Sequence, residues 1–292
     1  MLNLILYATT VAIWGSTWLV ITFQLRGSAP TTAVGWRFLL AGLILLAWCA
    51  VRRVSLKFTP RQYGLIVAQG LANFSFNYWM VYRAEARISS GLVAVIFTLL
   101  LVFNMIGARL FFAQAISRRA ALGAGCGLLG VLLVFWPEVS HFETGGRAWQ
   151  GLLIALLATS ISSVGNLLSV KTYNDGIPVI PNITIGMTIG GLTMLGFAAL
   201  TGETITIPLT LEFLGSLLYL SLFGSVIAFA AYLTLIGRVG AGRASYNGVL
   251  IPIIALALST LFEGYHWHLA SLAGVAMSVL GNILVMQGKA RS

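Results

Sequence analysis

The feature that most constrains this chain is a series of long apolar runs separated by short segments that carry its charges. A helix needs roughly 20 apolar residues to cross a bilayer, and the runs have about that length. Only 8% of the 292 residues are charged, whereas soluble domains carry about 25%. The runs are continuous, unlike the short alternating segments of a membrane β-barrel. We therefore predict an all-α integral membrane protein with ten spans at about residues 3–23, 33–50, 62–82, 89–112, 120–136, 149–170, 180–200, 213–236, 244–262 and 270–287.

The basic residues predict how these spans are oriented. Ten spans place both termini on one side, where eleven lysines and arginines lie, against four on the opposite side. Cytoplasmic loops carry the excess of Lys and Arg, so both termini are expected in the cytoplasm. The formal charge of +10 is spread over span ends rather than gathered in one patch, which argues against a nucleic-acid partner.

A segment near the middle of the chain is repeated near its end. Residues 122–134 read LGAGCGLLGVLLV, and 151 positions later residues 273–285 read AGVAMSVLGNILV, so that Gly123 falls on Gly274 and Gly130 on Gly281. A repeat of five spans is odd in number, so the second copy must enter the membrane from the opposite side. The sequence thus predicts two inverted five-helix repeats, 1–140 and 141–292, and inverted repeats favour alternating access.

The repeated glycines predict a structural role for the fifth and tenth spans. Small residues spaced four apart, such as Gly123 and Gly127 or Gly274 and Ser278, let two membrane helices approach closely. We expect these spans to act as a scaffold or a dimer contact and not to bind substrate. The oligomeric state stays open, and we favour a monomer.

The third span is the most polar and supplies the first candidate site residues. Asn73 and Asn77 lie one turn apart, beside a stripe that includes Tyr78 and Tyr82. Uncharged polar groups at this depth face a cavity or a partner helix. For the two asparagines the alternative is a hydrogen bond between helices, and for Tyr82 it is the interfacial aromatic belt.

Further candidates come from other spans at similar depth. The first span and its repeat partner, the sixth, both place polar side chains near the midplane, where inverted-repeat carriers bind substrate. The alternative for a serine is a hydrogen bond to the backbone of its own helix. The expected substrate-binding residues are Trp14, Thr17, Asn73, Asn77, Tyr78, Tyr82, Thr98, Ser163, Asn166 and Tyr246.

Charged groups are nearly absent from the predicted spans. No Asp, Glu, Lys or His lies in the middle of one, and Arg37 and Arg109 are shallow enough to snorkel. Attraction of a substrate carboxylate to Arg37 at the outer mouth is the alternative. Without a buried carboxylate relay, a facilitator or exchanger is the simplest carrier. The three histidines lie in predicted outer loops, so we expect no enzyme, no metal and no cofactor.

Several short patterns together resemble the drug/metabolite transporter superfamily, in its ten-helix EamA type, over the whole chain. One departure is Ala113-Gln114, where the family usually has Gly-Glu. The residues that carry the resemblance are Trp14-Gly15, Pro30 to Arg37-Phe38 with Ala41, Ala113 to Ser117 leading to Gly123 and Gly130, and Phe262-Glu263 followed by Gly281.

Within this family the chain resembles amino-acid exporters, including the YddG-type aromatic amino acid exporters of bacterial inner membranes. The resemblance implies an inner-membrane exporter of small metabolites, namely amino acids with aromatic or other apolar side chains. The alternative is another solute class, such as drugs, nucleobases or nucleotide sugars. Nucleotide sugars would need deep Lys or Arg for phosphate. The expected partners are the small-molecule substrate and the lipid bilayer.

Overall fold

The computed structural model describes residues 2–140, 146–239 and 247–287, which hold helices and no strand. Eight helices in these ranges are long and apolar enough to cross a membrane, and α13 is a shorter apolar helix. With the third span, in which the π-helical residues 72–76 join α3 to α4, they account for the ten predicted spans, so the predicted fold class is confirmed. The helices are α1 (Leu2–Leu25), α2 (Pro30–Val51), α3 (Pro60–Leu71), α4 (Asn77–Glu85), α5 (Ser90–Ile96), α6 (Leu100–Phe112), α7 (Arg118–Ser140), α8 (Arg147–Asn174), α9 (Val179–Leu200), α10 (Leu211–Leu218), α11 (Ala228–Val239), α13 (Asn247–Phe262) and α14 (Leu269–Gln287).

Local sequence signals set several helix ends. Pro30 and Pro60 stand at the starts of α2 and α3, where a missing N–H costs nothing. Thr59 also caps α3, since its hydroxyl accepts from the backbone N–H of Gln62 and the Gln62 amide oxygen accepts from the N–H of Thr59. Gly202, with φ of 73°, turns the chain after α9.

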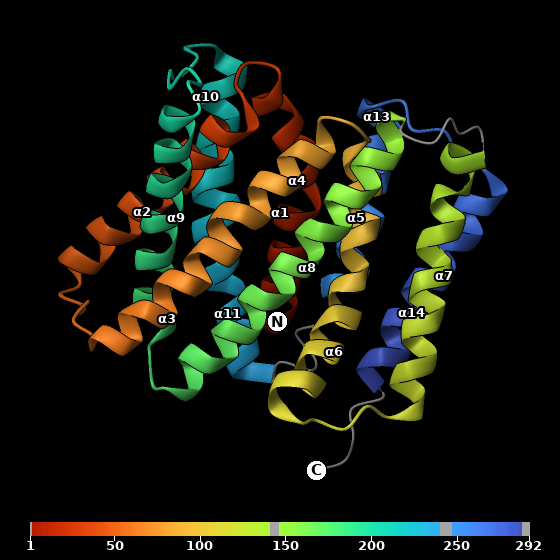
Figure 1. The fold of residues 1–292 in the computed structure, drawn as a ribbon, viewed down its shortest axis with the longest axis horizontal. Coiled ribbons are helices and arrows are strands. Elements are labelled where there is room, and N and C mark those ends of the chain that lie inside the picture. Colours follow the sequence, from red (N-terminus) through yellow and green to blue (C-terminus); the bar gives the residue numbers. More distant parts are fainter. Residues whose placement is uncertain (1, 141–145, 240–246, 288–292) are drawn as a thin grey trace.

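Helices α7 and α14 form a tight antiparallel pair at one end of the molecule (Figure 1). A Cβ built on Gly123 would lie 2.6 Å from the carbonyl oxygen of Gly281, and one built on Gly130 would lie 2.6 Å from that of Gly274. The repeated glycines therefore face each other and let the two backbones touch. This is the scaffold role that the sequence predicts for these spans.

Helices α2 and α9 form a second close pair at the opposite end (Figure 1). A Cβ on Gly35 would meet the Leu195 side chain, and one on Gly42 would lie 2.7 Å from the backbone nitrogen of Thr188. Because a later residue of α2 meets an earlier residue of α9, the pair runs antiparallel. Both pairs join equivalent spans of the two halves, which are therefore inverted.

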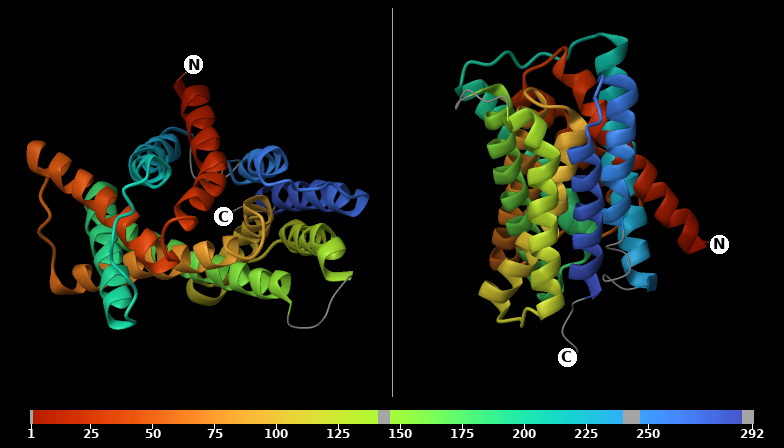
Figure 2. Two further views of the ribbon diagram at one scale, coloured as in Figure 1. Left: turned by 90° about the horizontal axis from the view of Figure 1, so that it is seen from above. Right: turned by 90° about the vertical axis from the view of Figure 1, so that its right-hand side faces the viewer.

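The remaining helices fill the space between the two pairs, as Figure 2 shows in two further views. Helix α1 packs on α11 and α13, and α8 packs on α4 and α6. Exchanging the halves converts the first set of contacts into the second, as expected for an inverted repeat. The division between residues 140 and 141 stays a prediction, since residues 141–145 lie outside the described ranges.

Two of these central spans contain a π-helical segment at equivalent positions. Residues 72–76 link α3 to α4, and residues 219–227 link α10 to α11. The offset of 151 carries the first segment onto residues 223–227, inside the second. A π-helical turn frees backbone groups from the α-helical pattern and is frequent at functional sites.

Candidate functional site

Arg37 lies at the centre of a polar cluster between the two halves. Its side chain is only 1% exposed and fully enclosed by protein. The guanidinium carbon lies 4.6 Å from the centre of the Tyr78 ring and 5.0 Å from that of Phe38, so two aromatic faces hold the cation. The expectation that Arg37 snorkels to the interface is wrong, because the side chain points toward α4 rather than toward the lipid.

Tyr82 joins Arg37 to the first helix. Its hydroxyl donates to the amide oxygen of Gln24 at 2.5 Å and accepts from Nη1 of Arg37 at 3.4 Å. Tyr82 is fully buried. An interfacial aromatic belt requires contact with the headgroup region, so this alternative for Tyr82 is wrong.

The π-helical segment 219–227 closes the other side of the cluster. The indole Nε1 of Trp14 donates to the carbonyl oxygen of Gly224 at 3.1 Å, and the methyl group of Thr17 packs at the same glycine. The Ser221 hydroxyl donates to the backbone carbonyl of Arg37 at 2.9 Å. Four of the predicted site residues, Trp14, Thr17, Tyr78 and Tyr82, thus converge around Arg37.

Asn73 belongs to a second polar group, which joins the third span to α8. Its Nδ2 donates to the Ser169 hydroxyl at 3.4 Å, and Gln69 donates to the same oxygen at 3.2 Å. The Asn73 amide fits against Gly165, where a Cβ would collide with it. The interhelical hydrogen bond that was the alternative for Asn73 is therefore present.

The other predicted residues differ in their surroundings. Asn77 is buried, and its amide oxygen has no hydrogen-bond partner. The Thr98 hydroxyl donates to the backbone carbonyl of Val95 in the same span, at 2.7 Å. Ser163 is buried and Asn166 half-buried on α8, and neither contacts the Arg37 cluster through a recorded hydrogen bond. Tyr246 lies outside the described residues.

Sequence reasoning missed several members of the cluster. Gln24 and Ser221 are residue types common in helices, and their roles come from contacts with helices that are distant in the sequence. Gly224 contributes only its backbone carbonyl oxygen and the close approach that a missing side chain allows. Arg37 did give a signal, since charged residues inside spans are costly and mark functional positions.

Two acidic residues lie at helix ends, Glu85 at the end of α4 and Glu263 directly after α13. Glu85, the last residue of α4, is 8% exposed, and neither carboxylate oxygen has a hydrogen-bond partner. Glu263 instead accepts from both the backbone nitrogen and the hydroxyl of Ser90, the latter at 2.5 Å. Glu85 is therefore a buried carboxylate close to residue 82, where the third predicted span ends.

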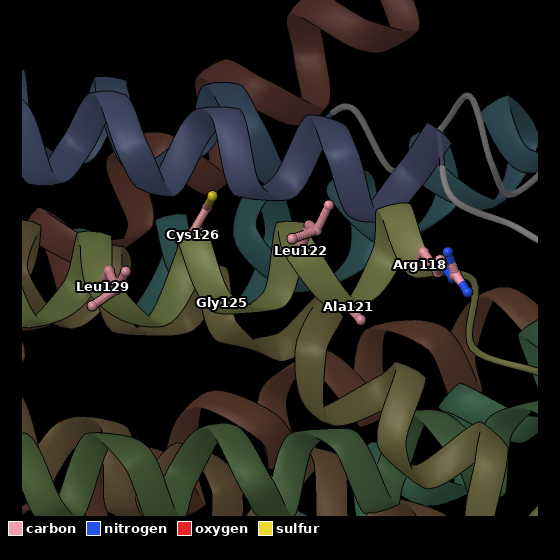
Figure 3. Close-up of a pocket in the computed structure, with 6 residues that line it drawn as sticks. All are labelled: Arg118, Ala121, Leu122, Gly125, Cys126 and Leu129. Carbon is pink, nitrogen blue, oxygen red and sulfur yellow. The ribbon is translucent and has the colours of Figure 1, made fainter.

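Two grooves lie outside this cluster. The larger, of about 570 Å³, is lined only by residues of α7, from Arg118 to Leu129 (Figure 3). Leu122 and Leu129 are both more than half exposed there, so this is an apolar outer face of the scaffold helix. The smaller groove lies between α1 and α10 and includes Tyr219, the first residue of the second π-helical segment, whose hydroxyl is 2.7 Å from that of Ser16.

A protein-family model describes the same two-part organisation. The EamA-like transporter family model matches residues 1–136 and again residues 149–287. The chain belongs to the EamA-like transporter family. This confirms the resemblance noted in the sequence and identifies the protein as a membrane transporter.

Two relatives of this EamA-like transporter carry transporter names and a third does not, and none of the three names states a substrate. It is 30% identical to the uncharacterized inner membrane transporter YedA of Escherichia coli K12, over 95% of this chain and 88% of that protein. It is 27% identical to the uncharacterized transporter YdfC of Bacillus subtilis, over 95% and 89% of the two chains. Protein PagO of Salmonella typhimurium is 26% identical, over 97% and 92%.

A solved crystal structure supports the fold. It superposes with a TM-score of 0.71 over 97% of this chain and 95% of its own, at 16% sequence identity. At that identity the likeness concerns the fold alone.

Proposed function

We propose that this transporter exports amino acids, chiefly those with aromatic or other apolar side chains, from the cytoplasm by alternating access. The Arg37 cluster carries the proposal. It combines a cation, tyrosine and tryptophan rings and backbone groups, and these are the chemical partners of a carboxylate and an apolar side chain.

The arrangement of helices supports alternating access. Two antiparallel helix pairs, α2 with α9 and α7 with α14, lie at the two ends of the molecule. Within each pair the backbones are in direct contact at glycines. The cluster lies between them, where helices of both halves meet. Movement of one half against the other would open the cluster to either side in turn.

The charge distribution supports the direction of insertion. Eleven basic residues on the side of the termini against four on the other favour cytoplasmic termini in a bacterial inner membrane. A single chain already places both repeats around the cluster, which favours a monomer as the working unit.

The test is counterflow in proteoliposomes. Vesicles are loaded with a panel of unlabelled amino acids, and uptake of the labelled compound is followed with and without a pH gradient. We expect accelerated uptake of apolar amino acids that is reduced about 5- to 30-fold in Asn77→Ala and Tyr78→Ala, since each loses an interaction worth about 1–2 kcal/mol.

Matched substitutions outside the site serve as controls. Tyr173→Ala and Asn174→Ala change the same residue types at exposed positions near the end of α8, and we expect both to retain wild-type uptake. Absence of counterflow for every amino acid would refute the proposal and favour another solute class, such as nucleobases or drugs.

A further inference from the structure

Arg37 is a buried cation with no carboxylate at ion-pair distance among the described residues. In the described part of the chain the ion pairs are Arg26 with Glu212 and Lys171 with Asp175, so no described carboxylate oxygen lies within 4 Å of the Arg37 guanidinium. Its one recorded hydrogen bond goes to the neutral Tyr82 hydroxyl, and its Nε has no partner at all. Taking an ion out of water costs several kcal/mol, so an unpaired cation here needs a reason.

The guanidinium is closely packed at the interface between the two halves. A Cβ on Gly224 would stand 3.5 Å from its Nη2 and only 2.8 Å from the Thr17 methyl group, so the glycine lets the segment 219–227 approach Arg37 closely. Gly224 also belongs to a π-helical segment, whose contacts with α1 and α2 join the two halves. Relative movement of the halves would change access to the cation.

We propose that Arg37 binds the carboxylate of the transported substrate; this rests on the proposed function and names the residue that selects for substrate charge. A carboxylate accepts two parallel hydrogen bonds from a guanidinium and supplies the missing negative charge. The Tyr82 hydroxyl holds the guanidinium when no substrate is bound, and the Tyr78 ring offers an apolar surface beside it.

Glu85 is the internal competitor for this role. It lies three residues after Tyr82 on α4 and is buried, with both oxygens unpartnered. The charges of Glu85 and Arg37 already interact in this structure, although the two groups form no ion pair. If Glu85 were the true partner of Arg37, neutralising either residue would disturb transport of acids and amides alike. The substrate-carboxylate proposal instead predicts a loss confined to Arg37 and to the acid.

The experiment measures competition by an acid and by its primary amide. Counterflow of labelled amino acid is inhibited with L-phenylalanine or L-leucine and with L-phenylalaninamide or L-leucinamide, in wild type, Arg37→Gln, Arg37→Lys and Glu85→Gln. The matched control is Arg109→Gln, an exposed arginine at the end of α6. Wild type should prefer the acid by about 10- to 100-fold, the range of one charge-assisted hydrogen-bonded pair.

In Arg37→Gln the preference for the acid should disappear while inhibition by the amide stays the same, and Arg37→Lys should keep part of the preference. Glu85→Gln and Arg109→Gln should retain it. An unchanged preference in Arg37→Gln, or an equal loss in Glu85→Gln, overturns the proposal. If Arg37→Gln does not yield folded protein, a wild-type preference in Arg37→Lys overturns it equally. Should wild type exchange no amino acid, the proposed function fails and this site with it.

Discussion

The contact between α7 and α14 predicts that a single methyl group at Gly130 destabilises the protein. A Cβ there would lie 2.5 Å from the backbone nitrogen of Ser278 and 2.6 Å from the carbonyl oxygen of Gly274, whereas ordinary contact begins at 3.4 Å. The two helices must then move apart by roughly 0.9 Å to bring the Ser278 nitrogen to ordinary contact distance, because backbone atoms cannot avoid the methyl group by changing rotamer.

The expected cost follows from two opposing effects. Replacing glycine by alanine favours the helix by about 1 kcal/mol, while forcing one extra carbon into a close-packed contact costs about 1–3 kcal/mol and separates other contacts along the pair. We expect Gly130→Ala to lower the free energy of unfolding by about 1–2 kcal/mol. The measurement is reversible unfolding by dodecyl sulfate in mixed micelles, followed by tryptophan fluorescence.

Gly125 provides the matched control on the same helix. A Cβ there would meet nothing within 4 Å, so Gly125→Ala should leave stability unchanged or raise it by up to about 1 kcal/mol. If Gly130→Ala proves as stable as Gly125→Ala, the backbone contact between the two scaffold helices does not carry the energy assigned to it, and the reasoning fails.

Three further variants test other contacts. Tyr82→Phe removes the donor to Gln24 and leaves buried polar atoms unpaired, so dodecyl sulfate unfolding should show a loss of about 1–3 kcal/mol. Gly165→Ala pushes the Asn73 amide aside, so in counterflow it should lower transport in wild type yet add nothing in an Asn73→Ala background; an additive effect would contradict the contact. Arg26→Ala breaks an ion pair whose side chains are 60% and 59% exposed, and unfolding should change by less than about 0.5 kcal/mol.

The fold could be predicted because its signals are local. Each span is an apolar run of the right length, and the glycines of α7 and α14 mark by their spacing the surfaces that touch. The third span is one continuous helix, as predicted, but its π-helical turn was not predicted, because no residue in 72–76 indicates one. This segment packs against α8 and α9, and those contacts cannot be read from the sequence of the span itself.

The site could be predicted only in part, because its members meet across long separations. The tyrosines of α4 were found from their helical stripe. Whether Arg37 snorkels or stays buried depends on Tyr82, 45 residues later, and on Gly224, far along the second half. A charged residue near a span end is compatible with both outcomes until those neighbours are known.

The two halves share one arrangement of helices but differ in charge at the position of Arg37. The offset of 151 carries Arg37 onto Thr188, a neutral residue whose hydroxyl bonds to the Thr184 carbonyl in its own helix. An inverted repeat with identical copies would offer the substrate equal binding in its two conformations. With a cation in one copy alone, the affinity for substrate can differ between the two conformations. A ligand shifts the equilibrium between two states by its differential affinity for them. For a carrier without an energy source, unequal affinities on the two sides must be balanced by unequal rates of conformational change. The asymmetry therefore sets the substrate concentration at which each side saturates, whereas net direction comes from the gradient.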